Sequence, residues 1–201
     1  MMSDQSVTAF FGGSFDPPHP GHLGVASGAL KSGRCSKVLW VPAFDPPHKQ
    51  GVERRTFAER VEMVSEMISG FDGMEISDIE KRLALVPSYT FKVMESLEKE
   101  CSSQLALLIG EDSLAQLHTW FKAHELVEKY LILTYPRTGT TVDMAYLEQF
   151  WSKEEAQKLL SGMIDGKFFE ISSTEIRKLL AKNAKWSDIK ELTNKIMNNG
   201  E

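Results

Sequence analysis

The stretch "FFGGSFDPPHPGH" at residues 10–22 contains the end of an apolar run, a glycine pair and the two histidines of Asp-Pro-Pro-His-Pro-Gly-His. It overlaps the apolar run "VTAFF" at 7–11, which predicts a strand, and leads into a segment at 21–32 that predicts a helix. Gly12 and Gly13 lie between the two elements, and without Cβ atoms they let backbone amides approach a ligand closely. A strand, a glycine turn and a helix in this order are typical of α/β proteins that bind ligands at the carboxyl ends of their strands.

Short apolar runs alternate with longer amphipathic segments along the rest of the chain. Further strands are predicted at 37–42, 74–79, 104–110, 130–136 and 167–171, and further helices at 54–69, 88–101, 112–128, 143–162, 172–182 and 185–199. The alternation predicts an α/β fold: a Rossmann-like, doubly wound parallel sheet with helices on both faces and a helical C-terminal end. Because no low-complexity linker divides the chain, we expect a single domain over 1–201, with 172–201 as its helical C-terminal part.

Composition narrows the class of protein. The 201 residues are 42% hydrophobic and 25% charged, as in an ordinary globular protein, and the net charge of −5 argues against a protein that coats nucleic acid. Cys35 and Cys101 have no metal-type spacing and form no disulfide framework, which favours a reducing compartment. No signal peptide or membrane-length apolar run is seen. We therefore expect a cytoplasmic protein with no nucleic-acid or membrane partner.

The five residues Phe-Asp-Pro-Pro-His occur twice, in "SFDPPHPGH" at 14–22 and in "AFDPPHKQG" at 43–51. A true repeat would extend into the neighbouring residues, and here the preceding segments differ. Both stretches follow predicted strands, and the carboxyl ends of parallel strands meet at one edge of a sheet. We therefore interpret them as two loops of one site.

His19 and His22 flank Pro20 and Gly21 where the first helix is predicted to begin. A helix N-terminus attracts phosphate through its amides and dipole, and two imidazoles can donate to the same oxygens. The glycines and prolines of the stretch could instead only shape a turn. A zinc site would need at least one further ligand, and neither cysteine is close in sequence. The spacing also matches neither the dinucleotide fingerprint nor a P-loop.

Two other stretches carry groups suited to anions. Lys49 lies on a proline-stiffened loop near Arg54, Arg55 and Arg60, which makes a local cationic field in an acidic protein, although a solvated surface loop would look the same. In "ISSTEIRKLL" at 171–180, a capping box accounts for the serine and glutamate but requires neither Thr174 nor Arg177. Hydroxyls at a helix N-terminus, with an arginine one turn in, also form a phosphate site.

Together with "PSYT" at 87–90 and "IGEDSLAQLHTW" at 109–120, these motifs resemble the nicotinate-nucleotide adenylyltransferases of the His-x-Gly-His nucleotidyltransferase superfamily. The resemblance runs over most of the chain. It implies an enzyme that transfers AMP from ATP to nicotinate mononucleotide, giving nicotinate adenine dinucleotide and pyrophosphate in NAD biosynthesis. The partners it implies are these two substrates, with Mg²⁺ arriving with ATP and with a homo-oligomer left open. We expect no metal site built from protein residues alone.

The resemblance also assigns residues. Its implied catalytic residues are His19, His22, Lys49 and Arg177. Its implied ATP-binding residues are Gly12, Gly13, Ser14, Phe15, His19, His22, Gly110, Asp112, Ser173, Thr174 and Arg177. Its implied substrate-binding residues are Lys49, Ser88, Tyr89, Thr90 and Trp120.

One departure from the family pattern concerns substrate choice. Val86 stands before the "PSYT" motif, where the family commonly has glycine, which leaves the preference for nicotinate or nicotinamide open. Two alternatives also stay open. One is a related transferase that acts on nicotinamide mononucleotide or pantetheine phosphate, and the other is a nucleotide sensor without catalysis.

Overall fold

Five parallel strands form one sheet in the computed structural model, which describes residues 6–44, 55–136, 141–165, 173–181 and 185–198. The strands are β1 (Val7–Gly13), β2 (Lys37–Pro42), β3 (Met74–Ile76), β4 (Gln104–Gly110) and β5 (Leu131–Tyr135). They lie in the order β3-β2-β1-β4-β5, and all pairs are parallel. The predicted doubly wound parallel sheet is confirmed.

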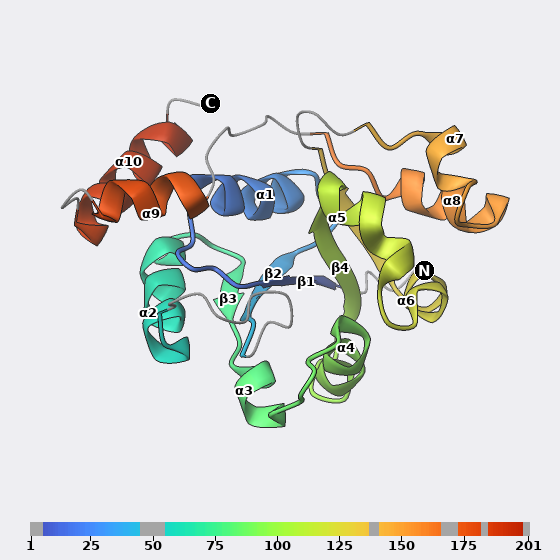
Figure 1. The fold of residues 1–201 in the computed structure, drawn as a ribbon, viewed down its shortest axis with the longest axis horizontal. Coiled ribbons are helices and arrows are strands. Elements are labelled where there is room, and N and C mark those ends of the chain that lie inside the picture. The colour runs from blue at the N-terminus through green and yellow to red at the C-terminus, as the bar shows by residue number, and fades with distance from the viewer. Residues whose placement is uncertain (1–5, 45–54, 137–140, 166–172, 182–184, 199–201) are drawn as a thin grey trace.

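Helices cover both faces of the sheet (Figure 1). They are α1 (Pro20–Lys31), α2 (Phe57–Ile68), α3 (Ile79–Leu83), α4 (Thr90–Glu98), α5 (Glu111–Gln116), α6 (Ala123–Lys129), α7 (Met144–Leu147), α8 (Lys153–Ser161), α9 (Ser173–Ala181) and α10 (Trp186–Asn198). One core cluster packs α1 and α2 against strand residues such as Trp40, and the other packs α3, α4, α6 and α8 against residues such as Phe10 and Leu107. Alternate strand residues thus point to opposite cores.

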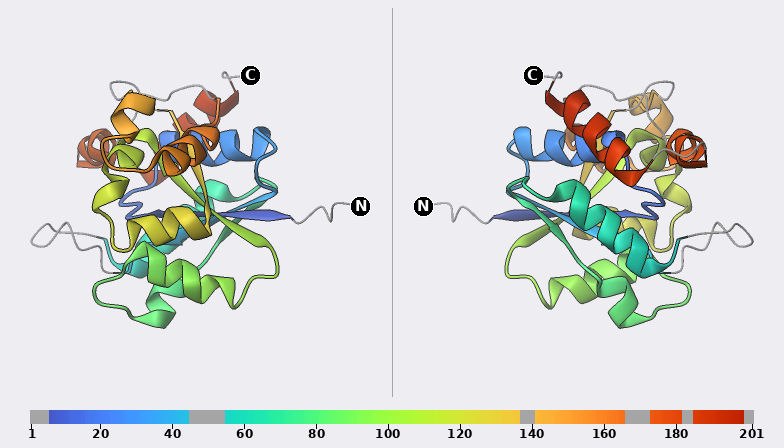
Figure 2. Two further views of the ribbon diagram at one scale, coloured as in Figure 1. Left: turned by 90° about the vertical axis from the view of Figure 1, so that its right-hand side faces the viewer. Right: turned by 90° about the vertical axis from the view of Figure 1, so that its left-hand side faces the viewer.

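The C-terminal helices return to the first half of the chain. Figure 2 shows α10 lying across the face that α1 and α2 cover. The indole nitrogen of Trp186 in α10 donates to the Glu66 carboxylate in α2, at 2.8 Å. Within the described ranges, no helix has the length and apolar character needed to cross a membrane.

Several predicted boundaries are wrong. The helix expected at 112–128 is three pieces, because a 3-10 turn (Leu117–Thr119) follows α5 and Lys122 takes a left-handed conformation (φ 55°) before α6. The helix expected at 143–162 is divided into α7 and α8, and the strand expected at 74–79 ends at Ile76, so that α3 begins at Ile79. Apolar spacing continues across such breaks and cannot reveal them. The strand predicted at 167–171 lies outside the described residues.

The strand order reverses between β1 and β4. From β1 the chain proceeds to β2 and β3 on one side, whereas β4 leads to β5 on the other. The chain segments that follow β1 and β4 run to opposite sides of the sheet. A crevice therefore opens between them at the carboxyl ends of β1 and β4. Gly12 and Gly13 end β1 at that edge, and Gly110 ends β4. The topology therefore places the motif at 10–22 beside the motif at 109–120.

Gly162 forms a hydrogen bond to the edge strand β5, and its tight packing leads to a prediction about stability. Its carbonyl accepts from the Thr134 amide at 2.9 Å, and a Cβ on it would lie 1.8 Å from the Ile132 carbonyl oxygen. Because backbone occupies that space, we expect Gly162→Ala to lower the free energy of unfolding by about 3 kcal/mol or more. Thermal denaturation of Gly162→Ala beside Ser161→Ala, an exposed neighbour, measures the effect. Equal melting temperatures would contradict the packing argument.

Candidate active site

Two adjoining cavities open at the crevice between β1 and β4. The first, of about 180 Å³, is lined by both His19 and His22 and is called the histidine cavity. The second, of about 610 Å³, is lined by Tyr89 and Phe121 among others and is called the aromatic cavity. Residues that line both are Gly12, Leu108, Ile109, Asp112, Ser113 and Trp120. Ligands in the two cavities can therefore contact each other.

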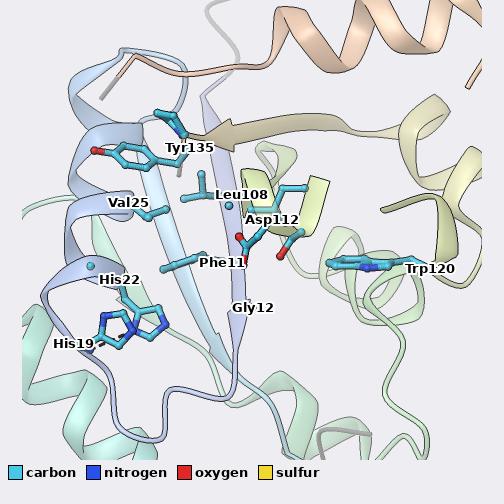
Figure 3. Close-up of a pocket in the computed structure, with 14 residues that line it drawn as sticks. Phe11, Gly12, His19, His22, Val25, Leu108, Asp112, Trp120 and Tyr135 are labelled. Atoms are coloured by element: carbon cyan, nitrogen blue, oxygen red, sulfur yellow. Dashed lines mark hydrogen bonds between the residues drawn. The ribbon is translucent and has the colours of Figure 1, made fainter. Parts of the chain in front are cut away.

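The two histidines form a defined pair at the start of α1 (Figure 3). His19 is 4% exposed, and its ring centroid lies 3.7 Å from that of His22. The backbone N–H of His19 donates to Nδ1 of His22 at 3.2 Å. Since Nδ1 accepts this bond, a neutral His22 ring carries its proton on Nε2. Both imidazoles line the histidine cavity, and imidazole N–H groups can donate to anionic oxygens.

Phe15 explains the shape of the loop that precedes the histidines. It has φ +45°, a conformation that is uncommon for a bulky side chain and that needs support from its surroundings. Its ring is 2% exposed and packs edge-on against Phe11 at 5.4 Å and His22 at 5.0 Å. A Cβ on Gly13 would lie 2.9 Å from the Phe15 ring. Gly13 therefore has a packing role whether or not its amide also meets a ligand.

The C-terminal motif lies against the same loop. Arg177 in α9 donates from Nη1 to the Asp16 carbonyl oxygen at 2.8 Å and from Nη2 to the Thr174 hydroxyl at 2.9 Å. The structure thus brings Thr174 and Arg177 to the histidine loop from a distant part of the sequence. The Ser173 side chain is not among those described.

The second Phe-Asp-Pro-Pro-His stretch is described only at its beginning. Its first residues adjoin the first stretch, because the Ala43 amide donates to the Gly13 carbonyl at 2.8 Å. Lys49 and Arg54 lie outside the described residues. Arg55 pairs with Asp16 at 3.1 Å, and Arg60 donates to backbone carbonyls. The expected cationic field is therefore not supported for Arg60, which is engaged by the protein itself.

Aromatic side chains surround the second cavity. The predicted residues Ser88, Tyr89, Thr90 and Trp120 all line it. Tyr89 stacks on Phe121 with centroids 4.5 Å apart and planes 18° apart, and Lys92 Nζ lies within 5.7 Å of both ring centroids. Flat aromatic rings in the wall of a cavity suit a planar heterocyclic ligand. Sequence reasoning missed Phe121, although its place directly after Trp120 was a usable signal.

Asp112 lies where the two cavities meet. Figure 3 shows its carboxylate between the histidine pair and Trp120. Gly110, the N-cap of α5, lines the histidine cavity beside it. Sequence reasoning also missed Tyr135 in this cavity and Glu80 in the aromatic one. Over the part of the chain that is described, no group of three His, Cys, Asp or Glu side chains could hold a metal ion.

Comparisons with known proteins agree with this arrangement. The cytidylyltransferase-like family model matches residues 10–179. A "Probable nicotinate-nucleotide adenylyltransferase" of Clostridium tetani is 32% identical over 185 residues, which cover 92% of this chain and 90% of that protein. The chain belongs to the nicotinate-nucleotide adenylyltransferase family. A family member from Gloeobacter violaceus is 38% identical over 134 residues, 66% of this chain and 65% of its own.

A solved structure of the family shares the fold. Plasmodium falciparum nicotinic acid mononucleotide adenylyltransferase, complexed with NaAD, superposes with a TM-score of 0.68 over 94% of this chain and 92% of that one. The sequence identity is 19%, so this likeness concerns the fold. The Rossmann-like architecture expected of the family is confirmed.

Proposed function

We propose that the protein transfers AMP from ATP to nicotinate mononucleotide, giving nicotinate adenine dinucleotide and pyrophosphate in NAD biosynthesis. The observation that carries the proposal is the junction of the two cavities at Asp112 and Trp120. ATP fits the histidine side, where donors converge on anionic oxygens, and the mononucleotide fits the aromatic side. The relatives named as nicotinate-nucleotide adenylyltransferases support this reaction.

The reaction needs little covalent help from the protein. An oxygen of the mononucleotide phosphate attacks the α-phosphorus of ATP, the bond from that phosphorus to the β-phosphate oxygen breaks, and pyrophosphate leaves with the electron pair. The attacking phosphate is already an anion at neutral pH, so no general base is required. Catalysis consists of holding two anions in line and of stabilising the charge on the leaving group.

Each proposed role follows from the chemistry of the group. His22 donates from Nε2 to the α- and β-phosphates together with His19. Thr174 and Arg177 bind the β- and γ-phosphates; Arg177 already lies against the histidine loop, 2.8 Å from the Asp16 carbonyl. Lys49 neutralises phosphate charge from the loop after β2. Tyr89, Thr90 and Trp120 hold the pyridine nucleotide by stacking and hydrogen bonding.

A divalent metal ion fits this site as a companion of ATP. Mg²⁺ takes one or two protein carboxylates and fills its other positions with phosphate oxygens and water. Asp112 lines both cavities and is the carboxylate that would hold it. When bound with ATP, the ion would offset the negative charge of the triphosphate. Asp112 lines both cavities, and without the ion its negative charge would repel the anionic groups of both proposed ligands.

Acceptor choice tests the proposal. We expect rapid pyrophosphate release from ATP and Mg²⁺ with nicotinate mononucleotide, slower release with nicotinamide mononucleotide, and none with pantetheine phosphate. The acid is expected to be the better acceptor because the relatives are named nicotinate-nucleotide adenylyltransferases. Release with pantetheine phosphate alone would contradict the assignment of the aromatic cavity.

A further inference from the structure

Two buried side chains of opposite charge lie beside the aromatic cavity, and Glu80 lines it. Arg60 in α2 is 4% exposed, and Glu80 in α3 is 8% exposed. Burying such groups costs free energy unless each is paired and hydrogen-bonded. The groups that bind Arg60 and Glu80 therefore show which parts of the chain these two side chains hold together.

Arg60 connects the loop after β1 to the loop after β2. Its Nη1 donates to the Ser14 carbonyl at 2.8 Å, and its Nη2 donates to the Ala43 carbonyl at 2.7 Å. The guanidinium is planar and its nitrogens are fixed relative to one another, so the two carbonyls are held at one separation. The loop after β1 is the one that carries Phe15 and the two histidines. Phe57, whose ring lies 5.5 Å from the guanidinium carbon, covers the contact.

Glu80 holds the first residue pair after β2 against α3. Its Oε2 accepts from the Phe44 amide at 2.9 Å. Glu80 and Ser88 both line the aromatic cavity. Burial raises the pKa of Glu80, whereas the hydrogen bond from the Phe44 amide and the Arg60 charge act in the opposite direction. The carboxylate thus interacts with the backbone directly after β2 and with the charge of Arg60.

We propose that Arg60 and Glu80 are positioning residues, which hold residues 43–44, directly after β2, against the histidine loop and against α3. The inference rests on the proposed function, since Ser14, Ala43 and Glu80 line the cavity in which the mononucleotide would bind. The Arg60 contacts are with main-chain carbonyls, which makes it a positioning residue rather than a catalytic one. A displacement of about 1 Å between reacting groups can cost on the order of 100-fold in rate, so a rigid connection matters for turnover.

Two substitutions of similar side-chain length test the role of Arg60, because they remove the planar guanidinium with its two terminal nitrogens. Arg60→Lys keeps the charge but cannot hold two carbonyls at a fixed separation, and Arg60→Met removes all donors. We expect kcat to fall about 10-fold or more for Arg60→Lys and further for Arg60→Met, with a higher KM for nicotinate mononucleotide, in protein that circular dichroism shows to be folded. Glu80→Gln keeps an acceptor for the Phe44 amide, so we expect a smaller decrease in kcat for Glu80→Gln than for Glu80→Ala.

Arg82→Met is the matched control. Arg82 lies in α3, is exposed, and binds Asp78 and both oxygens of Glu100 at 2.8–2.9 Å. Its loss should lower the melting temperature slightly and leave kcat and both KM values unchanged. A general effect of removing a paired arginine would instead appear in both variants.

A purely structural pair would behave differently. If Arg60→Lys and Glu80→Ala lower the melting temperature but keep wild-type kcat and KM in the folded protein, the positioning role is wrong. Should Arg60→Met fail to fold, Arg60→Lys and Glu80→Gln decide the matter. If the wild type turns over no pyridine nucleotide, the proposed function fails separately. Calorimetric titration with ATP then tests the pair, with at least 5-fold weaker binding expected for Arg60→Lys and equal binding overturning the proposal.

Discussion

His22→Ala is expected to lower kcat for adenylyl transfer at least about 100-fold while the chain remains folded. Removing one donor that stabilises developing charge typically costs about 10² to 10³ in rate. The His19 amide donates to Nδ1 of His22, which leaves the proton of a neutral His22 ring on Nε2, the proposed donor to phosphate. Steady-state pyrophosphate release at saturating ATP and nicotinate mononucleotide measures the loss.

His124→Ala is the control for this variant. His124 is exposed and pairs with Glu155 at 2.7 Å, and it lines neither cavity. Its removal should leave kcat within a factor of two of the wild type, on the order of what surface substitutions cause. A folded His22→Ala protein with unchanged kcat would mean that the histidine pair has only a capping role at α1.

Trp120→Ala is expected to raise KM for nicotinate mononucleotide by about 10-fold or more, with a smaller effect on KM for ATP. Stacking of a base on an aromatic side chain contributes about 1–3 kcal/mol, which corresponds to roughly 5- to 150-fold in affinity. Trp120→Phe keeps a flat face and should restore most of the affinity. Separate titrations of the two substrates measure the difference.

Phe150→Ala provides the comparison for Trp120. Phe150 is 38% exposed and stacks on His118 at 3.7 Å, so it tests the loss of an aromatic side chain outside both cavities. We expect no change in either KM. If Trp120→Ala weakens both substrates equally, Trp120 is a packing residue shared by the two cavities and gives no specific support to the pyridine ring.

The sequence predicts the parallel sheet and the meeting of the two repeated loops. Strand-forming runs bounded by glycine and proline are strong local signals, and parallel connections leave few topologies. The prediction that both loops lie at one sheet edge is supported by the Ala43–Gly13 hydrogen bond. Lys49, the lysine expected to contribute from the second loop, stays a prediction because it lies outside the described residues.

The orientation of Arg60 could not be predicted from local charge. Beside Arg54 and Arg55 it looked like part of a solvated cationic cluster, and its burial depends on two carbonyls from separate loops. One signal was available: Arg60 lies four residues before the buried Val64, on the same face of α2. A charged residue on an apolar helix face indicates a buried partner, although the sequence cannot say which.

The position of α9 shows a second limit. The motif at 171–180 indicates a phosphate site by its own chemistry, yet its contact with the first loop joins residues at opposite ends of the chain. Such a contact follows from the whole topology and from no local pattern. In the same way, apolar periodicity cannot reveal the left-handed Lys122, which separates the 3-10 turn and the Trp120 that follows it from α6.

The most direct test follows the fate of the α-phosphate of ATP. The protein is incubated with ATP labelled at that phosphate, Mg²⁺ and nicotinate mononucleotide, and the products are separated by chromatography. We expect the label to appear in nicotinate adenine dinucleotide, in equal amount to the pyrophosphate released, and we expect omission of the mononucleotide to stop both. Label that remains in ATP, or that appears only as AMP, would contradict adenylyl transfer to this acceptor.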